Sequence, residues 1–351
     1  MIFDVVKVFA PAAFSFFVGI ALSPIIAHYL YKHKLWKNKT GAEKTGRGKV
    51  AIQSEIRKEK EAGTPLMGGV VIWASVLITS FVVFILSVLF SDSVTEKLNF
   101  ISRGQTWLPL FTLIVGSIVG LADDFLVIYG RRGYVAGGLP IPAKIGVILG
   151  IGFIGALWFY YKLGISAVSV PFLGEFELGL LFIPFFMIVM LALFSGGAID
   201  RIDGLSGGIM ATIFSAYSGI AFFQNQIDIA AFCAVVAGAI LAFLWFNIPP
   251  ARFYMSETGI LGLTTSLSIV AFLTDSVLVL PIIAFPLFLA SGYIIIQTLS
   301  KNLRAGEKIF SVTPVRRNFE ELGWPSYKIT MRVWVISVIT AIIGMIIALA
   351  G

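Results

Sequence analysis

The sequence contains little charge, one cysteine and only two histidines. Charged residues make up 13% of its 351 residues, whereas soluble proteins carry about a quarter, so the composition excludes a water-soluble domain. Cys233 alone cannot form a disulfide framework or a cysteine-based metal site. His28 and His33 flank the end of the first apolar run and have no acidic residue close by, which favours interfacial residues over metal ligands.

Apolar residues, by contrast, make up 58% of the chain. They form runs of roughly 17–25 residues, long enough for a helix to cross a hydrocarbon core of about 30 Å. A transmembrane barrel would need short alternating segments. The sequence therefore predicts an all-α integral membrane protein, with the first run retained as a span. The ten expected spans are 5–27, 66–90, 107–122, 144–163, 178–196, 207–224, 229–246, 258–274, 277–299 and 329–350.

Basic residues divide unequally between the two sets of loops. With flanking residues, one set holds 22 of the 26 Lys and Arg. Because basic loops stay in the cytoplasm, this set is expected to be cytoplasmic, with both termini outside the inner (plasma) membrane. We expect residues 1–351 to form a single polytopic domain, with its most basic loop against lipid headgroups. The basic loops are 28–65, 123–143, 197–206, 247–257 and 300–328.

Acidic residues recur at the cytoplasmic ends of the expected spans. A carboxylate at a membrane boundary is unfavourable unless it is paired, hydrated or bound to a cation. One such residue could simply cap a helix, but five at one depth indicate a shared site. Hard oxygen ligands suit Mg²⁺, which binds one or two carboxylates together with phosphate oxygens. The five are Asp123 and Asp124 in GLADDF, Asp200 and Asp203 in AIDRIDGLSGG, and Glu257 in SETG.

Basic side chains occur in the same cytoplasmic segments as these carboxylates. Arg and Lys bind phosphates through charge-assisted hydrogen bonds, so the segments predict a phosphate-handling cleft at the cytoplasmic face. Glycines in GTPLMGG and DGLSGG either let the backbone approach a ligand or allow tight helix packing in the membrane. A transporter would more often place polar residues at the bilayer midplane. The basic residues are Lys60, Arg131, Arg132, Lys144, Arg316 and Arg317.

These motifs occur in the order found in a known family. The chain resembles the phospho-N-acetylmuramoyl-pentapeptide transferases (the MraY family), within the polyprenyl-phosphate N-acetylhexosamine-1-phosphate transferases. The resemblance extends from residue 60 to the last span, and its most specific parts are the FNxxPAxxF pattern and the segment around GWP. It rests on GTPLMGG, GLADDF, IDGLSGG, FNIPPARFYMSETG and the late segment that ends in GWPSYKITMRVW.

The resemblance implies an Mg²⁺-dependent enzyme with one soluble and one lipid substrate. Such an enzyme transfers phospho-N-acetylmuramoyl-pentapeptide from its UDP-sugar to undecaprenyl phosphate, releases UMP and forms lipid I for peptidoglycan. A catalytic site at the cytoplasmic rim of the membrane suits this pair of substrates. Members of the family are often homodimers, which no feature of this sequence itself indicates, and no nucleic-acid partner is expected.

The resemblance also implies roles for individual residues. Asp123, Asp124 and Glu257 match catalytic and metal-binding positions, and one residue of the Asp pair acts as the base, although the sequence does not distinguish which. Asp203 matches a nucleotide contact, and Tyr254 matches the ring that stacks on uracil. The remaining substrate-binding positions match Lys60, Thr64, Arg131, Lys144, Asp200, Asn247, Gln297, Arg316, Arg317 and Asn318.

The chain departs from the family pattern at several of these positions. Arg316, Arg317 and Asn318 stand where the family has three histidines; arginine can hold a diphosphate but cannot shuttle protons. Glu257 replaces a metal-binding Asp. These changes leave three alternatives open: normal family activity, a transferase for another UDP-sugar such as UDP-N-acetylglucosamine, or a relative without catalysis. The other departures are Val127 for Lys, Asp200 for Asn, Ser206 for Asp and Ser256 for Gly.

Overall fold

The computed structural model describes residues 2–36, 63–90, 98–101, 104–129, 138–197, 203–303 and 323–351. Nine helices in these ranges are long and apolar enough to cross a bilayer. The prediction of an all-α, multi-pass membrane protein is confirmed. All α-helices in the described ranges, including α11 and α12, which are not among these nine, are α1 (Ile2–Lys32), α3 (Val70–Leu89), α5 (Gly104–Tyr129), α6 (Ile141–Leu157), α7 (Phe182–Gly196), α8 (Leu205–Phe223), α9 (Ile227–Asn247), α10 (Ser256–Leu273), α11 (Leu280–Ile283), α12 (Phe285–Leu303) and α14 (Ser326–Ala350).

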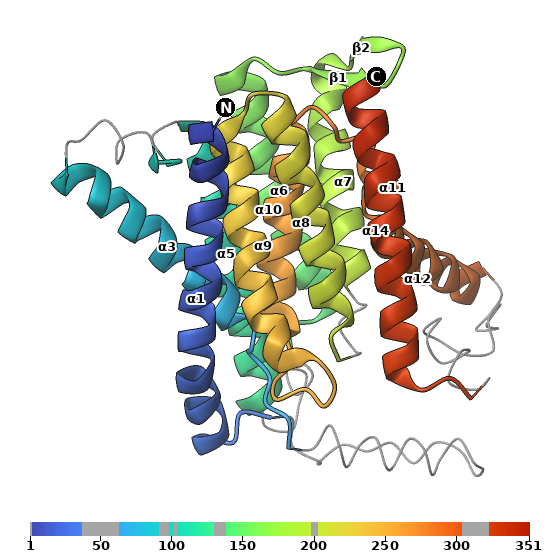
Figure 1. The fold of residues 1–351 in the computed structure, drawn as a ribbon. Coiled ribbons are helices and arrows are strands. Elements are labelled where there is room, and N and C mark those ends of the chain that lie inside the picture. Colours follow the sequence, from blue (N-terminus) through green and yellow to red (C-terminus); the bar gives the residue numbers. More distant parts are fainter. Residues whose placement is uncertain are drawn as a thin grey trace.

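The predicted span at 277–299 is a broken helix. Its first part is the single turn α11, and α12 begins at Phe285 after Ala284. Pro281 and Pro286 each lie in the first turn of their helix. Proline is tolerated there because the N–H groups of the first turn have no partner within the helix. In Figure 1, α12 leans out of the bundle on one side and α3 leans out on the other.

The centre of the bundle is formed by α9 and α10. In their most apolar parts 83% of the residues are buried, against 17% in α14. The sequence of α9, IDIAAFCAVVAGAILAFLWFN, is apolar on all sides and rich in alanine, as expected for a helix surrounded by other helices. The peripheral helices instead expose large apolar side chains, which suits contact with lipid.

Both termini lie at one end of the bundle (Figure 1). The same end carries a two-stranded hairpin, β1 (Ala167–Val170) and β2 (Gly174–Glu177), with Ala167 paired to Glu177. The expected spans 144–163 and 178–196 leave 164–177 as a loop, and the structure has this hairpin within it. The Asp275 carboxylate, in the connection after α10, accepts a hydrogen bond from the Ser169 backbone N–H at 3.2 Å, and this contact holds the hairpin against the bundle.

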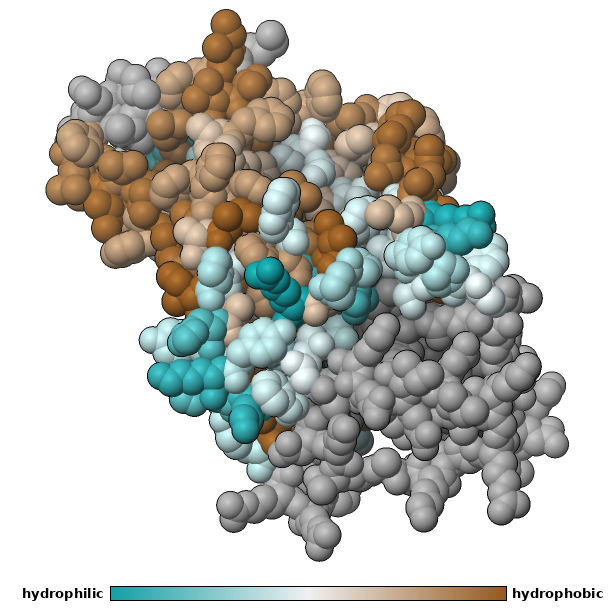
Figure 2. All heavy atoms as spheres, turned by 60° about the horizontal axis from the view of Figure 1, so that its bottom comes forward, coloured by the Kyte–Doolittle hydropathy of each residue, from teal (hydrophilic) through white to brown (hydrophobic). Residues whose placement is uncertain are grey.

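The opposite end of the bundle is polar. Figure 2 shows hydrophilic residues gathered on this face, whereas the flanks of the molecule are apolar. The Tyr31 hydroxyl near the end of α1 donates a hydrogen bond to the Arg252 carbonyl at 2.9 Å. This contact places the α9–α10 connection at the same end as the last turn of α1.

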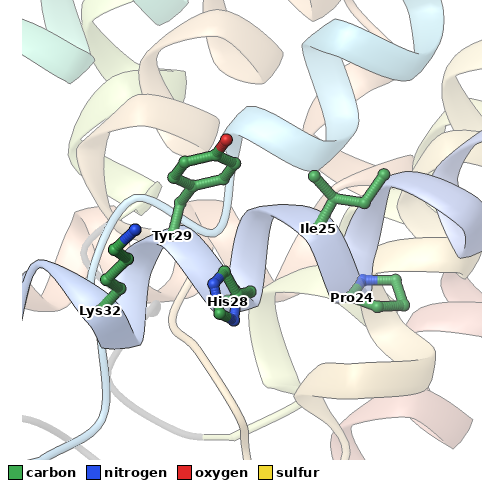
Figure 3. Close-up of a pocket in the computed structure, with 5 residues that line it drawn as sticks. All are labelled: Pro24, Ile25, His28, Tyr29 and Lys32. Carbon is green, nitrogen blue, oxygen red and sulfur yellow. The ribbon is translucent and has the colours of Figure 1, made fainter.

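A shallow groove lies along the outer surface of α1, near this polar end. Figure 3 shows the five residues that line it. His28 is exposed there, and the His33 ring stacks on the Tyr29 ring at a centroid distance of 6.5 Å. Because no carboxylate lines the groove, it is not the predicted catalytic cleft. Its lining residues are Pro24, Ile25, His28, Tyr29 and Lys32.

Candidate functional site

The site begins with the close approach of α5 and α10. A Cβ atom at Gly120 would lie 2.2 Å from the Glu257 carbonyl oxygen, and one at Gly116 would lie 2.6 Å from Thr265 Oγ1. The Thr265 hydroxyl also donates across the interface to the Thr112 carbonyl at 3.1 Å. Small residues allow such backbone contact between membrane helices. The packing brings the last turns of α5 against the first turn of α10.

Both oxygens of Asp124 accept hydrogen bonds from the first turn of α10. The Ser256 hydroxyl donates to Oδ1 at 2.5 Å. The Thr258 hydroxyl and the Thr258 backbone N–H donate to Oδ2 at 2.5 and 3.1 Å. The carboxylate is 1% exposed, so these donors replace the water that it has lost. A carboxylate near a helix N-terminus also interacts favourably with the helix dipole.

Asp123 and Glu257 share one cation. Lys144 Nζ lies 2.7 Å from Asp123 Oδ2 and 2.9 Å from Glu257 Oε1. Asp123 is buried, and its other oxygen accepts a hydrogen bond from the Leu139 backbone N–H at 2.5 Å. Three helices, α5, α6 and α10, therefore place charged groups at one point, as the sequence predicted for Asp123 and Glu257.

The donor set at this point fits a magnesium ion. Two carboxylates from different helices already surround one positive group, and Mg²⁺ typically takes one or two carboxylates plus phosphate oxygens. Asp124 differs because its two oxygens face the donors of Ser256 and Thr258. Among the residues that the structure describes, no three acidic, His or Cys side chains form a metal-binding group.

Asp203 and Asn247 contact the α9–α10 connection. The Asp203 carboxylate accepts a hydrogen bond from the Ala251 N–H at 3.3 Å. The buried Asn247 amide accepts from the Gly204 N–H at 2.9 Å and donates to the Phe253 carbonyl at 2.8 Å. Within the described residues, no hydrogen bond or ion pair joins Asp203 to the three carboxylates on α5 and α10.

The glycine motifs pack against protein. The N–H groups of Gly68 and Gly69 donate to the carbonyls of Tyr254 and Met255 at 2.7 and 3.1 Å. A Cβ atom at Gly69 would lie 2.3 Å from the Gly259 nitrogen. Both glycines are buried. For Gly68 and Gly69 the structure supports the packing alternative, because the α9–α10 connection and α10 occupy the space beside them.

The DGLSGG motif gives the same result. Gly204 has a φ of +76° and starts α8, a backbone conformation that glycine adopts without strain. A Cβ atom at Gly208 would lie 2.0 Å from Trp334 Nε1, and this indole N–H donates to the Gly204 carbonyl at 3.1 Å. Gly204 and Gly208 therefore allow α14 to pack on α8, which again supports the packing alternative.

Comparison of the sequence with known proteins shows the family of this chain. The family model described as glycosyl transferase family 4 matches residues 106–275. The phospho-N-acetylmuramoyl-pentapeptide-transferase of Listeria innocua is 32% identical over 292 residues, which cover 82% of this chain and 84% of that protein. The protein of the same name from Chloroflexus aurantiacus is 32% identical over 304 residues, 82% of this chain and 78% of its own.

The chain belongs to the phospho-N-acetylmuramoyl-pentapeptide transferase family. It is therefore a phospho-sugar transferase of glycosyl transferase family 4. The carboxylates Asp123, Asp124 and Glu257 all lie within the stretch that the family model matches, and so does Lys144.

The structure describes only some of the other residues that the family resemblance assigned to substrate. Thr64 and Tyr254 are half-buried next to the GTPLMGG contact with the α9–α10 connection. The described residues do not include Lys60, Arg131, Asp200, Arg316, Arg317 and Asn318, or the side chain of Gln297.

Sequence reasoning missed Thr258 and Leu139 as parts of this transferase site, and treated Ser256 only as a departure from the family pattern. Thr258 holds Asp124 through both its hydroxyl and its backbone, and Leu139 holds Asp123 through its N–H. A hydroxyl on each side of Glu257 in the first turn of a helix was a signal for two donors at that helix end. No side-chain signal marks Leu139, because its backbone makes the contact.

We expect Gly120→Ala to reduce both the stability and the activity of this family member. The atoms that a methyl group would meet are backbone atoms of Glu257 and Thr258, so α5 and α10 must separate at the site. Overpacking of this kind costs about 1–3 kcal/mol. Unfolding in detergent and UMP release measure the two effects. Gly150→Ala is the control, since nothing lies within 4 Å of its Cβ position, and an equal loss there would refute the explanation.

Ser256 combines backbone strain with a useful hydrogen bond. Its φ is +57°, a region that costs a non-glycine residue about 1–2 kcal/mol, while its hydroxyl binds Asp124. We expect Ser256→Gly to be more stable than Ser256→Ala by about 1 kcal/mol, because both lose the hydroxyl but only glycine loses the strain. Denaturant unfolding in micelles compares them, and equal stabilities would contradict the strained conformation.

Proposed function

We propose that this chain transfers phospho-N-acetylmuramoyl-pentapeptide from its UDP-sugar to undecaprenyl phosphate, releasing UMP and forming lipid I. The proposal is supported by relatives that carry this activity in their names and match 82% of the chain. The single observation that carries it in the structure is the meeting of Asp123 and Glu257, from separate helices, at one cation-binding point.

In the proposed reaction an oxygen of undecaprenyl phosphate attacks the sugar-linked phosphorus of the donor. A new phosphorus–oxygen bond forms as the bond to the UMP phosphate breaks. Phosphoryl transfer depends mainly on positioning and on neutralising charge, and Mg²⁺, when bound, supplies part of that neutralisation. Asp123 and Glu257 would hold the ion.

Within the Asp pair, the structure favours different roles. Asp124 accepts hydrogen bonds at both oxygens from Ser256 and Thr258, so its carboxylate is already engaged by the first turn of α10. One oxygen of Asp123 accepts a hydrogen bond from the Leu139 backbone N–H, and the other pairs with the Lys144 ammonium. We therefore assign Asp123 to the bound ion beside the acceptor phosphate, and Asp124 to fixing the start of α10.

The site is proposed to face the cytoplasm. It lies at the polar end of the bundle with the last turn of α1, whereas both termini lie at the opposite end. The basic loops of the sequence connect helices at the site end, and basic loops remain cytoplasmic. Both termini would then lie outside.

A homodimer is proposed on the family resemblance alone.

UMP release from the purified full chain in detergent tests this function. The assay compares UDP-N-acetylmuramoyl-pentapeptide with UDP-N-acetylglucosamine, each with undecaprenyl phosphate and with or without Mg²⁺. We expect release from the first donor only, and only with the metal. Release from UDP-N-acetylglucosamine instead would establish the alternative sugar specificity, and no release from either donor would refute the activity.

A further inference from the structure

We propose that Lys144 is a built-in counter-cation that competes with the divalent metal ion for Asp123 and Glu257. The inference rests on the proposed function for the metal, and concerns what the lysine does before the metal arrives. The ammonium lies 2.7 Å from one carboxylate and 2.9 Å from the other. It therefore occupies the space between the two oxygens that would face a bound ion.

Burial explains why a counter-cation is needed. The Asp123 carboxylate is 1% exposed, and an ionised carboxylate at such a position is strongly unfavourable without a partner of opposite charge. Lys144 is the positive partner of this carboxylate among the described residues. The ammonium thus keeps the two carboxylates together when no metal is bound.

The ammonium and a divalent ion cannot occupy this point together. Mg²⁺ contacts carboxylate oxygens at about 2.0–2.1 Å, so an ion on these oxygens would be within a few ångströms of Lys144 Nζ. Two positive groups at that separation repel strongly in a site with little water. Metal binding must therefore displace the ammonium.

Lys144 is suited to leave. It lies in the first turn of α6, which starts at Ile141, and the N-terminus of a helix disfavours a positive side chain. Its flexible stem allows the charge to move. Its side chain is 16% exposed and that of Glu257 is 31% exposed, so both can contact water or substrate. The Asp123 carboxylate, in contrast, is buried.

Binding of Mn²⁺ to the full chain without substrates, measured from the free Mn²⁺ signal by electron paramagnetic resonance, tests the inference. We expect Lys144→Met, which keeps an unbranched apolar stem, to bind Mn²⁺ at least about tenfold more tightly than the wild type. Lys144→Arg should bind it more weakly, because a guanidinium holds carboxylates through two hydrogen bonds. An unchanged or weaker affinity in Lys144→Met would overturn the inference, as would the absence of Mn²⁺ binding in all three proteins.

The chain offers a matched control at its other end. Lys7 of α1 forms an ion pair with Asp228 of α9 at 2.5 Å, and the two side chains are 14% and 10% exposed. Lys7→Met should destabilise the protein without changing Mn²⁺ affinity. Mn²⁺ should raise the Tm of Lys144→Met more than that of the wild type. It should leave the Tm difference between Lys7→Met and the wild type unchanged. Equal rescue of both variants would contradict a specific role for Lys144.

These outcomes separate the inference from the proposed function. If the wild type releases UMP but Lys144→Met gains no Mn²⁺ affinity, the inference fails and the function stands. If the affinities change as expected but no UDP-sugar yields UMP, the lysine does compete with the metal and the assigned activity is wrong.

Discussion

Glu257→Gln is expected to reduce UMP release by about 100-fold or more while the protein remains folded. The side chain is 31% exposed and its carboxylate pairs with Lys144 from another helix. Glutamine keeps the size but removes the charge, so the site loses one of its two shared carboxylates. Loss of a single charge-stabilising group in an active site commonly lowers kcat by about 10²–10³-fold. Initial rates of UMP release at saturating donor give the comparison.

The control for this variant is a carboxamide substitution at a carboxylate far from the site. Glu177→Gln changes an exposed side chain in β2, at the end of the bundle that carries the termini. It should leave the rate unchanged. A rate for Glu257→Gln within a few-fold of the wild type would show that this carboxylate has no part in catalysis.

Asp124→Asn is expected to abolish measurable turnover and to destabilise the protein by about 1–3 kcal/mol. The carboxylate accepts hydrogen bonds at both oxygens. An asparagine NH₂ group cannot accept, so one of these buried donors would face another donor. The first turn of α10 would then move, and Glu257 with it. Rates and unfolding free energies in detergent measure the two effects.

Asp228→Asn provides the comparison for Asp124→Asn. It also removes a charge from a nearly buried carboxylate, the partner of Lys7 at the other end of the bundle. It should lower stability without lowering the rate of the folded enzyme. Turnover in Asp124→Asn at the level of Asp228→Asn would mean that holding the start of α10 is unnecessary for catalysis.

The membrane fold follows from the sequence because long apolar runs must form helices in lipid. The expected span 229–246 matches α9, Ile227–Asn247, within a few residues. The break between α11 and α12 was not predicted, since two first-turn prolines inside one apolar run leave its length and hydropathy unchanged. The β1–β2 hairpin was missed for a related reason: of these eight residues only Val168 is buried, so the strands lack an alternating apolar face.

The sequence also predicted that Asp123 and Glu257 would meet, because charged groups at one membrane depth require partners. It could not predict the partners of Asp124, which depend on how closely Gly116 and Gly120 let α5 approach α10. Nor could it assign the glycines of GTPLMGG. A glycine permits close approach of any group, and Gly68 and Gly69 approach the protein itself.

The location of Mn²⁺ in crystals of the full chain, found from its anomalous scattering, tests the shared carboxylate site most directly. We expect one strong peak between the carboxylates of Asp123 and Glu257, with the Lys144 ammonium moved away from both. A bound Mn²⁺ ion held by other residues, with Lys144 still paired to Asp123 and Glu257, would contradict it.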